Sequence, residues 1–159
     1  MKARQAGTTS VEFAIVGTAA MLLLLGVIEV GRMIFVVNAL GEASRRGARL
    51  AAVCPINDPA IARTTVFSRS GGGAISPLLR GLSTDNVRLE YLDDAGAVIA
   101  DPTSNAGFLD IRYVRVSIQN FRHQLVLPLP IGAFELPNMP TTVPRESLGV
   151  PRDEAIRPC

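Results

Sequence analysis

The sequence is poor in the side chains on which most catalytic and recognition sites depend. It contains no tryptophan, two tyrosines and a single histidine, His123, so aromatic binding surfaces and histidine-ligated metal sites are both poorly supplied. Its formal net charge is only +2, and the chain lacks the basic stripe interleaved with aromatic residues that indicates a nucleic-acid partner. We therefore expect no bound metal, no cofactor and no nucleic acid.

Cysteine is equally scarce. The two cysteines, Cys54 and Cys159, are too few for a disulfide framework, and neither belongs to a CxxC motif. They can form one bridge if they reach an oxidising compartment, and we predict this disulfide. The alternative is that they are two unrelated small residues, because a sequence does not give the distance between them.

Signals for catalysis are missing as well. No G-x-S-x-G frame surrounds a serine, and Gly71–Gly73 lacks the Lys-Ser/Thr that follows in a phosphate-binding loop. Asp93 and Asp94 lie in a pattern typical of a turn, and His123 is interpreted as a surface or strand-end residue. We predict that the protein is not an enzyme. A membrane-tethered hydrolase, the alternative, would need a cleft with perturbed titratable groups.

Apolar side chains, by contrast, are abundant and gather near the N-terminus. Overall, 48% of the residues are hydrophobic and the mean hydropathy is +0.29. Phe13–Ile28 carries no charge, and as a helix it spans about 24 Å, against about 30 Å for a bilayer core. Because apolar residues resume beyond it, we predict a transmembrane segment at about residues 11–37. Glu29 and Arg32 are three residues apart and are expected to form an ion pair near the outer membrane surface.

The helical pattern continues beyond the apolar run. No proline occurs before Pro55, so we predict one helix over residues 8–53, roughly 68 Å long. A cleaved secretory signal is the rival interpretation, with Lys2 and Arg4 in its basic region. Two features argue against it: Glu12 stands at the start of the apolar run, and no A-x-A cleavage site follows the leucines.

The C-terminal half of this helix has a face of small residues. They recur every four positions: Ala39, Ala43, Gly47 and Ala51. Small side chains let another backbone approach closely, as in packed membrane helices. We predict that this face packs either against the chain's own C-terminal domain or against the helix of another subunit, and the sequence leaves both open.

The residues before the apolar run resemble a type IV prepilin cleavage region. Gly7 ends a short basic leader, and Glu12 follows five residues later, where the hydrophobic helix opens. Further blocks resemble, in order and spacing, the N-terminal signature of TadE-like proteins, the minor pilins or pseudopilins of the tight-adherence (Tad) pilus. These blocks are Ser10–Ala14, Ile28–Arg32, Asn38–Leu40 and Ala43–Arg49. The resemblance covers residues 4–53.

This resemblance implies a structural subunit that acts in pilus assembly and adhesion. A prepilin peptidase would cut the chain between Gly7 and Thr8. The protein would be a single-pass protein of the bacterial inner membrane with a periplasmic C-terminal domain, or a component of an extracellular pilus. Its implied partners are the peptidase, other pilin or pseudopilin subunits and the lipid bilayer.

Glu12 would become the fifth residue of the processed chain. Its carboxylate is expected to pair with the new α-amine of Thr8, either in the same chain or in a neighbouring subunit, where the pair would set the axial register. The alternative is that Glu12 lies in the headgroup region near the cytoplasmic face and is solvated. The alternative to a filament subunit is a membrane-tethered extracytoplasmic binding module that is not incorporated in a filament.

The remainder of the chain predicts a small α+β domain over residues 54–145. Alternating residues in 87–92 and 113–118, with a further segment at 139–143, predict an antiparallel sheet of three or four strands. Residues 97–100 are expected to form a returning strand after a turn.

Domain boundaries complete the prediction. Residues 1–7 are assigned as the leader and residues 146–159 as an irregular, proline-containing tail. Asp58-Pro59 predicts the start of a short helix between the long helix and the sheet. The predicted fold class is α+β and pilin-like: one long helix, its N-terminal half transmembrane, carrying a small domain.

Overall fold

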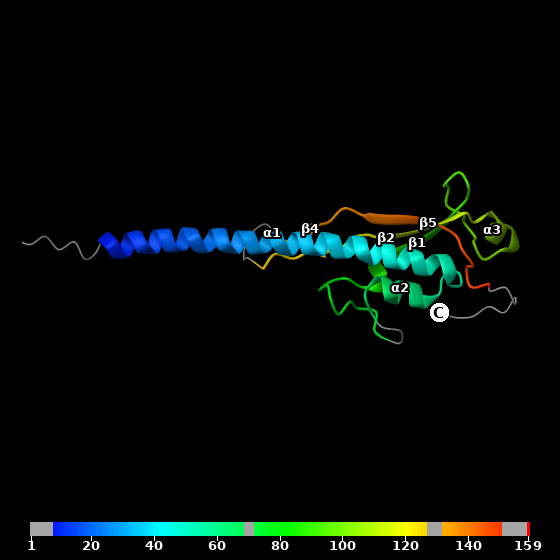
Figure 1. Cartoon of the computed structure of the whole chain (residues 1–159), viewed down its shortest axis with the longest axis horizontal. Helices are drawn as coiled ribbons and strands as arrows, with labels where there is room; N and C mark the ends of the chain where they lie inside the picture. The colour runs from blue at the N-terminus through cyan, green and yellow to red at the C-terminus, as the bar shows by residue number, and fades with distance from the viewer. Residues whose placement is uncertain (1–7, 69–71, 127–131, 151–158) are drawn as a thin grey trace, which may run out of the picture.

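The computed structural model describes residues 8–68, 72–126, 132–150 and 159. The N-terminal half of the long helix α1 (Thr8–Val53) extends away from the rest of the molecule, and all other elements lie around its C-terminal half (Figure 1). The part of α1 before Glu29 is called the bare helix below. The predicted leader, residues 1–7, lies outside the described residues, as does most of the predicted tail.

Helix α1 is continuous, which confirms the predicted long helix. The first proline of the chain, Pro55, follows directly after its end, and proline cannot continue a helix. The first buried residue of α1 is Glu29. The exposed half before it is long and apolar enough to cross a membrane, although a signal sequence would have the same length and composition.

A three-stranded antiparallel sheet forms the base of the domain. Its strands are β1 (Val87–Leu92), β2 (Tyr113–Ile118) and β5 (Met139–Pro144), in the order β1-β2-β5. Residue Val114 of the central strand pairs with Tyr91 on one side and Val143 on the other. The predicted α+β class with an antiparallel sheet is therefore confirmed.

Five short elements complete the described fold. Helix α2 (Pro59–Thr65) begins at the predicted Asp58-Pro59 cap, and η1 (Thr84–Asn86) precedes the sheet. Helix α3 (Asn105–Asp110) was not predicted. Strand β3 (Arg122–His123) pairs with β4 (Phe134–Glu135).

The expected strand at residues 97–100 is reduced to a single bridge between Leu92 and Val98. The prediction of a full strand was wrong because the chain bends at Ala100, so the four apolar residues after the turn at residues 93–96 form only this one bridge.

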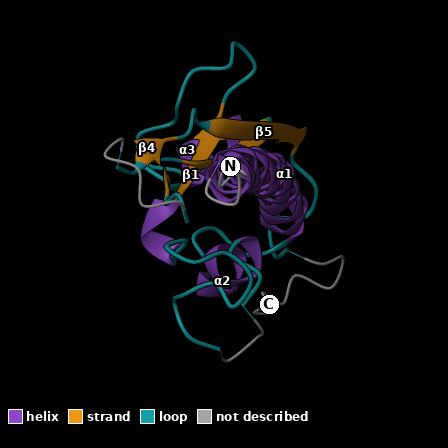
Figure 2. Ribbon diagram, turned by 90° about the vertical axis from the view of Figure 1, so that its left-hand side faces the viewer, coloured by secondary structure: helices purple, strands orange, loops and turns teal. Residues whose placement is uncertain are grey.

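The core lies where α1 passes between the sheet and α2. Figure 2, which looks nearly along α1, shows the strands on one side of the helix and α2 on another. Two apolar clusters fill this space. Leu40, Leu82 and Ile118 belong to the one nearer the bare helix, and Ala48 and Val114 to the other. The C-terminal half of α1 is thus an integral part of the domain.

Candidate anchor and assembly site

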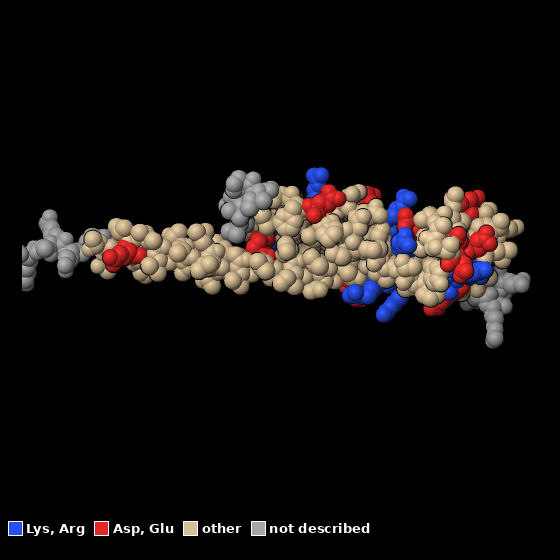
Figure 3. Space-filling view, turned by 90° about the horizontal axis from the view of Figure 1, so that it is seen from above, with Lys and Arg blue, Asp and Glu red and all other residues tan. Residues whose placement is uncertain are grey.

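The bare half of α1 exposes large apolar side chains on all sides. Phe13, Leu23 and Val27 have exposed fractions of 78%, 73% and 71%. Charged side chains instead lie mainly on the domain (Figure 3). A contiguous apolar surface of this extent is not found on monomers in water and marks a surface that contacts lipid or other protein.

The predicted processing region lies at the start of this half. Gly7 lies outside the described residues, and α1 begins at Thr8. Glu12 is exposed, one helical turn further on. In the chain as it stands, Thr8 is preceded by Gly7 and carries a peptide nitrogen, so the predicted pairing of Glu12 with an α-amine requires cleavage first.

Glu29 marks the point where the bare helix meets the domain. Its carboxylate accepts hydrogen bonds from Arg32 Nη1, at 2.9 and 3.1 Å, and from the backbone N–H of Val126, at 3.0 Å. His123 Nε2 lies 3.4 Å from Glu29 Oε1. Because a carboxylate only accepts, this contact is a hydrogen bond when Nε2 carries the ring proton. The Glu29–Arg32 ion pair of the sequence prediction is therefore one part of a larger cluster that fixes the domain to the helix.

His123 is buried, with an exposed fraction of 3%, and its ring packs 5.5 Å from that of Phe134. It does lie in a strand end, in β3, but the expectation of a surface position was wrong. Its burial depends on Glu29, 94 residues away in the chain, and no local pattern reports such a contact.

The face of small residues on α1 packs against the chain's own domain. Ala43, Gly47 and Ala51 are buried, and Ala39 is half-buried beside the apolar cluster that contains Leu40. A Cβ atom at Gly47 would overlap with the Thr65 hydroxyl of α2 and would lie 3.0 Å from a methyl group of Val116 in β2. Glycine is therefore required where α1 passes between α2 and the sheet.

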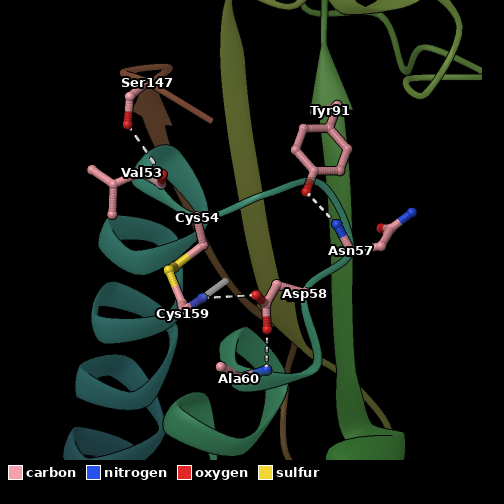
Figure 4. The surroundings of a disulfide bond; sticks show 8 residues. All are labelled: Val53, Cys54, Asn57, Asp58, Ala60, Tyr91, Ser147 and Cys159. Carbon is pink, nitrogen blue, oxygen red and sulfur yellow. Dashed lines mark hydrogen bonds between the residues drawn. A yellow bond between two sulfur atoms is a disulfide. The ribbon is translucent and has the colours of Figure 1, made fainter. Parts of the chain in front are cut away.

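A disulfide joins Cys54, just after α1, to Cys159 (Figure 4). Asp58 links the two segments further. Its Oδ1 accepts the Ala60 N–H that caps α2, at 2.8 Å, and its Oδ2 accepts the Cys159 N–H, at 3.0 Å. Beside it, Ser147 donates its hydroxyl hydrogen to the Val53 carbonyl, at 3.1 Å. The end of α1, the start of α2 and the C-terminal residue are thereby held together.

Tyr91 of β1 contacts the segment between α1 and α2. Its hydroxyl oxygen accepts the Asn57 N–H at 3.0 Å. Burial raises the pKa of the Tyr91 hydroxyl, and the Asn57 hydrogen bond opposes that shift only in part. Among the described residues, no group of three or more His, Cys, Asp or Glu side chains is arranged to hold a metal ion.

The architecture is a long N-terminal helix with an apolar stretch, whose C-terminal half enters the core of a small α+β domain. Over residues 7–49 the chain matches the model of the TadE-like protein family, so the resemblance seen in the sequence is confirmed for this segment. This is a structural, pilus-related family of the Tad system. The match extends from the candidate processing site through the bare helix to the face of small residues. No curated protein and no solved structure matches the chain.

Proposed function

We propose that the protein is a minor pilin-like subunit of a Tad or related type IV-like pilus, anchored in the bacterial inner membrane by α1 with its domain in the periplasm. One observation carries the proposal: the TadE-like match covers residues 7–49 and includes the uncharged run Phe13–Ile28, most of whose large apolar side chains are exposed in the described part of the chain. A structural subunit needs such a surface, first in the bilayer and then among other helices.

The membrane segment is best assigned to the bare helix before Glu29. The sequence prediction of about residues 11–37 included positions such as Val36, which is buried against the domain. Since α1 is continuous across the junction, the domain is attached to its anchor without a flexible linker. The Cys54–Cys159 disulfide suits an oxidising compartment such as the periplasm.

Processing is the second part of the proposal. A prepilin peptidase cuts between Gly7 and Thr8 and leaves a positively charged amine one helical turn from Glu12. The pair then forms within one chain or between adjacent subunits. The domain would contribute to assembly and adhesion from outside the bilayer.

Mass spectrometry of the protein recovered from cells tests this directly. We expect Thr8 at the mature N-terminus. Gly7→Leu should block cleavage and leave residues 1–7 attached, whereas Gly17→Leu, on the open surface of the bare helix, should be processed normally. A mature N-terminus beyond the leucines would instead identify a cleaved secretory signal and would exclude the proposal.

A membrane-tethered binding module is the second candidate, favoured by the absence of any match to the family beyond residue 49. Recovery in a sheared pilus fraction separates the two. A filament subunit is found there together with other pilins, whereas a tethered module remains with the inner membrane.

A further inference from the structure

We propose that a cleft at the junction of α1 and the domain binds the phosphate group of an anionic membrane phospholipid. The inference rests on the proposed function only in requiring that α1 spans a membrane. The cleft has a volume of about 550 Å³ and is bordered by three separate segments of the chain. They contribute Arg32 and Phe35 of α1, Leu78 and Arg80 of the loop before η1, and His123 and Val126 at and after β3.

Two guanidinium groups give the cleft its chemistry. Arg32 uses one nitrogen, Nη1, to bind Glu29 and remains 41% exposed, so part of its five-donor fork is available. Arg80 is exposed and forms no ion pair within the described part of the chain. Since Glu29 balances the charge of Arg32, Arg80 supplies the net positive charge. Arginine binds phosphate through paired hydrogen bonds, so an anionic phosphate complements this pair.

Apolar side chains surround these charges. Phe35, Leu78 and Val126 border the cleft with exposed fractions of 53%, 51% and 70%. A soluble anion would gain nothing from them. The glycerol and upper acyl region of a lipid would cover them, and apolar surface beside basic residues is the usual composition of a site at the membrane interface.

The height of the cleft above the membrane matches a headgroup. Arg32 lies four residues beyond Ile28, the last residue of the uncharged run, which is about 6 Å along the helix. The headgroup layer on each side of a bilayer core is roughly 5–7 Å thick. With the bare helix in the bilayer core, the guanidinium of Arg32 is therefore level with the phosphates of the periplasmic leaflet.

Native mass spectrometry of the full chain in detergent tests the proposal with added phosphatidylglycerol. We expect a retained lipid in the unaltered protein and at least a fivefold loss of that species in Arg80→Gln. Arg88→Gln, which changes an exposed arginine on β1 away from the cleft, is the matched control and should retain the lipid. Diacylglycerol with the same acyl chains should not be retained, because it has no phosphate.

Thermal unfolding supplies an independent readout. Phosphatidylglycerol should raise the Tm of the unaltered protein and of Arg88→Gln but not that of Arg80→Gln, and inorganic phosphate should not replace it. Equal lipid retention by Arg80→Gln, or equal stabilisation by inorganic phosphate, would overturn the proposal. Membrane fractionation separates this failure from failure of the proposed function. If Arg80→Gln fractionates with membranes and still retains the lipid, the proposal for this cleft fails while the proposed membrane anchor stands.

Discussion

At Gly47 a single missing methyl group decides whether α1 fits between α2 and the sheet. The Thr65 hydroxyl that a Cβ would meet is fully buried and donates to the Ile61 carbonyl at 2.8 Å, so it has no free space to enter. We expect Gly47→Ala to lower the free energy of unfolding by about 1–3 kcal/mol, because overpacking outweighs the helix propensity of alanine. Gly47→Leu should be more damaging.

Gly41→Ala is the matched control for this prediction. A Cβ at Gly41 would meet only the Arg45 side chain, at 3.8 and 3.9 Å. It should stabilise the protein by up to about 1 kcal/mol through helix propensity alone. Thermal unfolding of the full chain in detergent measures both, and similar effects for the two variants would contradict the tight packing at Gly47.

The role proposed for Glu12 depends on assembly with other subunits. An unpaired carboxylate costs about 2.5–3.5 kcal/mol at the centre of a bilayer, so Glu12→Gln should leave insertion into the membrane intact or improve it. We expect the same variant to reduce co-purification with partner pilins, because the neutral amide cannot pair with a positively charged amine. Glu42→Gln, exposed on the domain half of α1, serves as the control. Normal assembly of Glu12→Gln with the leader removed would rule out the register role.

Residues differ in how far a sequence reveals their contacts. The pairing of Glu29 with Arg32 follows from a spacing of three within a helix and could be predicted. The contacts of Glu29 with His123 and Val126 join segments more than 90 residues apart, and they arise only when the domain folds onto α1. The cleft beside Arg80 was missed for the same reason, since its three bordering segments have no common sequence signal.

Strand β5 is an edge strand whose outer side is protected by proline. Arg145, just after β5, donates its backbone N–H to the carbonyl oxygen of Arg112, just before β2. Because N–H directions alternate along a strand, the N–H groups of the odd-numbered residues in β5 also face β2. The backbone nitrogens of residues 140, 142 and 144 therefore face outward. Two of these three residues are prolines, Pro140 and Pro144, and carry no N–H. The free edge therefore offers one outward backbone donor, at Thr142, to a passing strand.

Replacing both prolines by threonine should restore two outward donors and promote edge-to-edge association. We expect the Pro140→Thr/Pro144→Thr variant to form larger species at concentrations where the unaltered protein remains monodisperse in detergent, measured by light scattering. Pro77→Thr, in an exposed loop away from the sheet edge, should not. An unchanged size distribution in the double variant would show that something other than proline protects this edge.

Elements with a clear period were predictable from the sequence, and short ones were not. The predicted strands at residues 87–92 and 113–118 coincide with β1 and β2, and the apolar residues that alternate in β2, Val114, Val116 and Ile118, are all buried. Helix α3 spans six residues and β3 only two. These segments are too short to show the 3.6-residue period of a helix or the two-residue period of a strand. Ser104, whose side chain accepts the Gly107 N–H at 3.1 Å, was the one local signal that could have indicated α3.

For the molecule as a whole, the disulfide is the largest single constraint on the unfolded chain. It closes a loop with a sequence separation of 105 residues, for which the chain-entropy model gives about 4–5 kcal/mol. Reduction should therefore lower the Tm by about 10–20 °C. The Cys54→Ala/Cys159→Ala variant should unfold near the Tm of the reduced protein and respond to no reductant. Equal Tm values with and without reductant in the unaltered protein would contradict a formed bridge.

The same bridge gives the molecule an unusual response to being cut. Every peptide bond between Cys54 and Cys159 lies inside one covalent ring, and that ring hangs from α1. A protease that cuts one of these bonds opens the ring but releases no fragment, since both new ends stay covalently attached to α1. Limited proteolysis should thus give an intact mass on a non-reducing gel and separate fragments on a reducing one. A domain nicked once would therefore remain joined to α1.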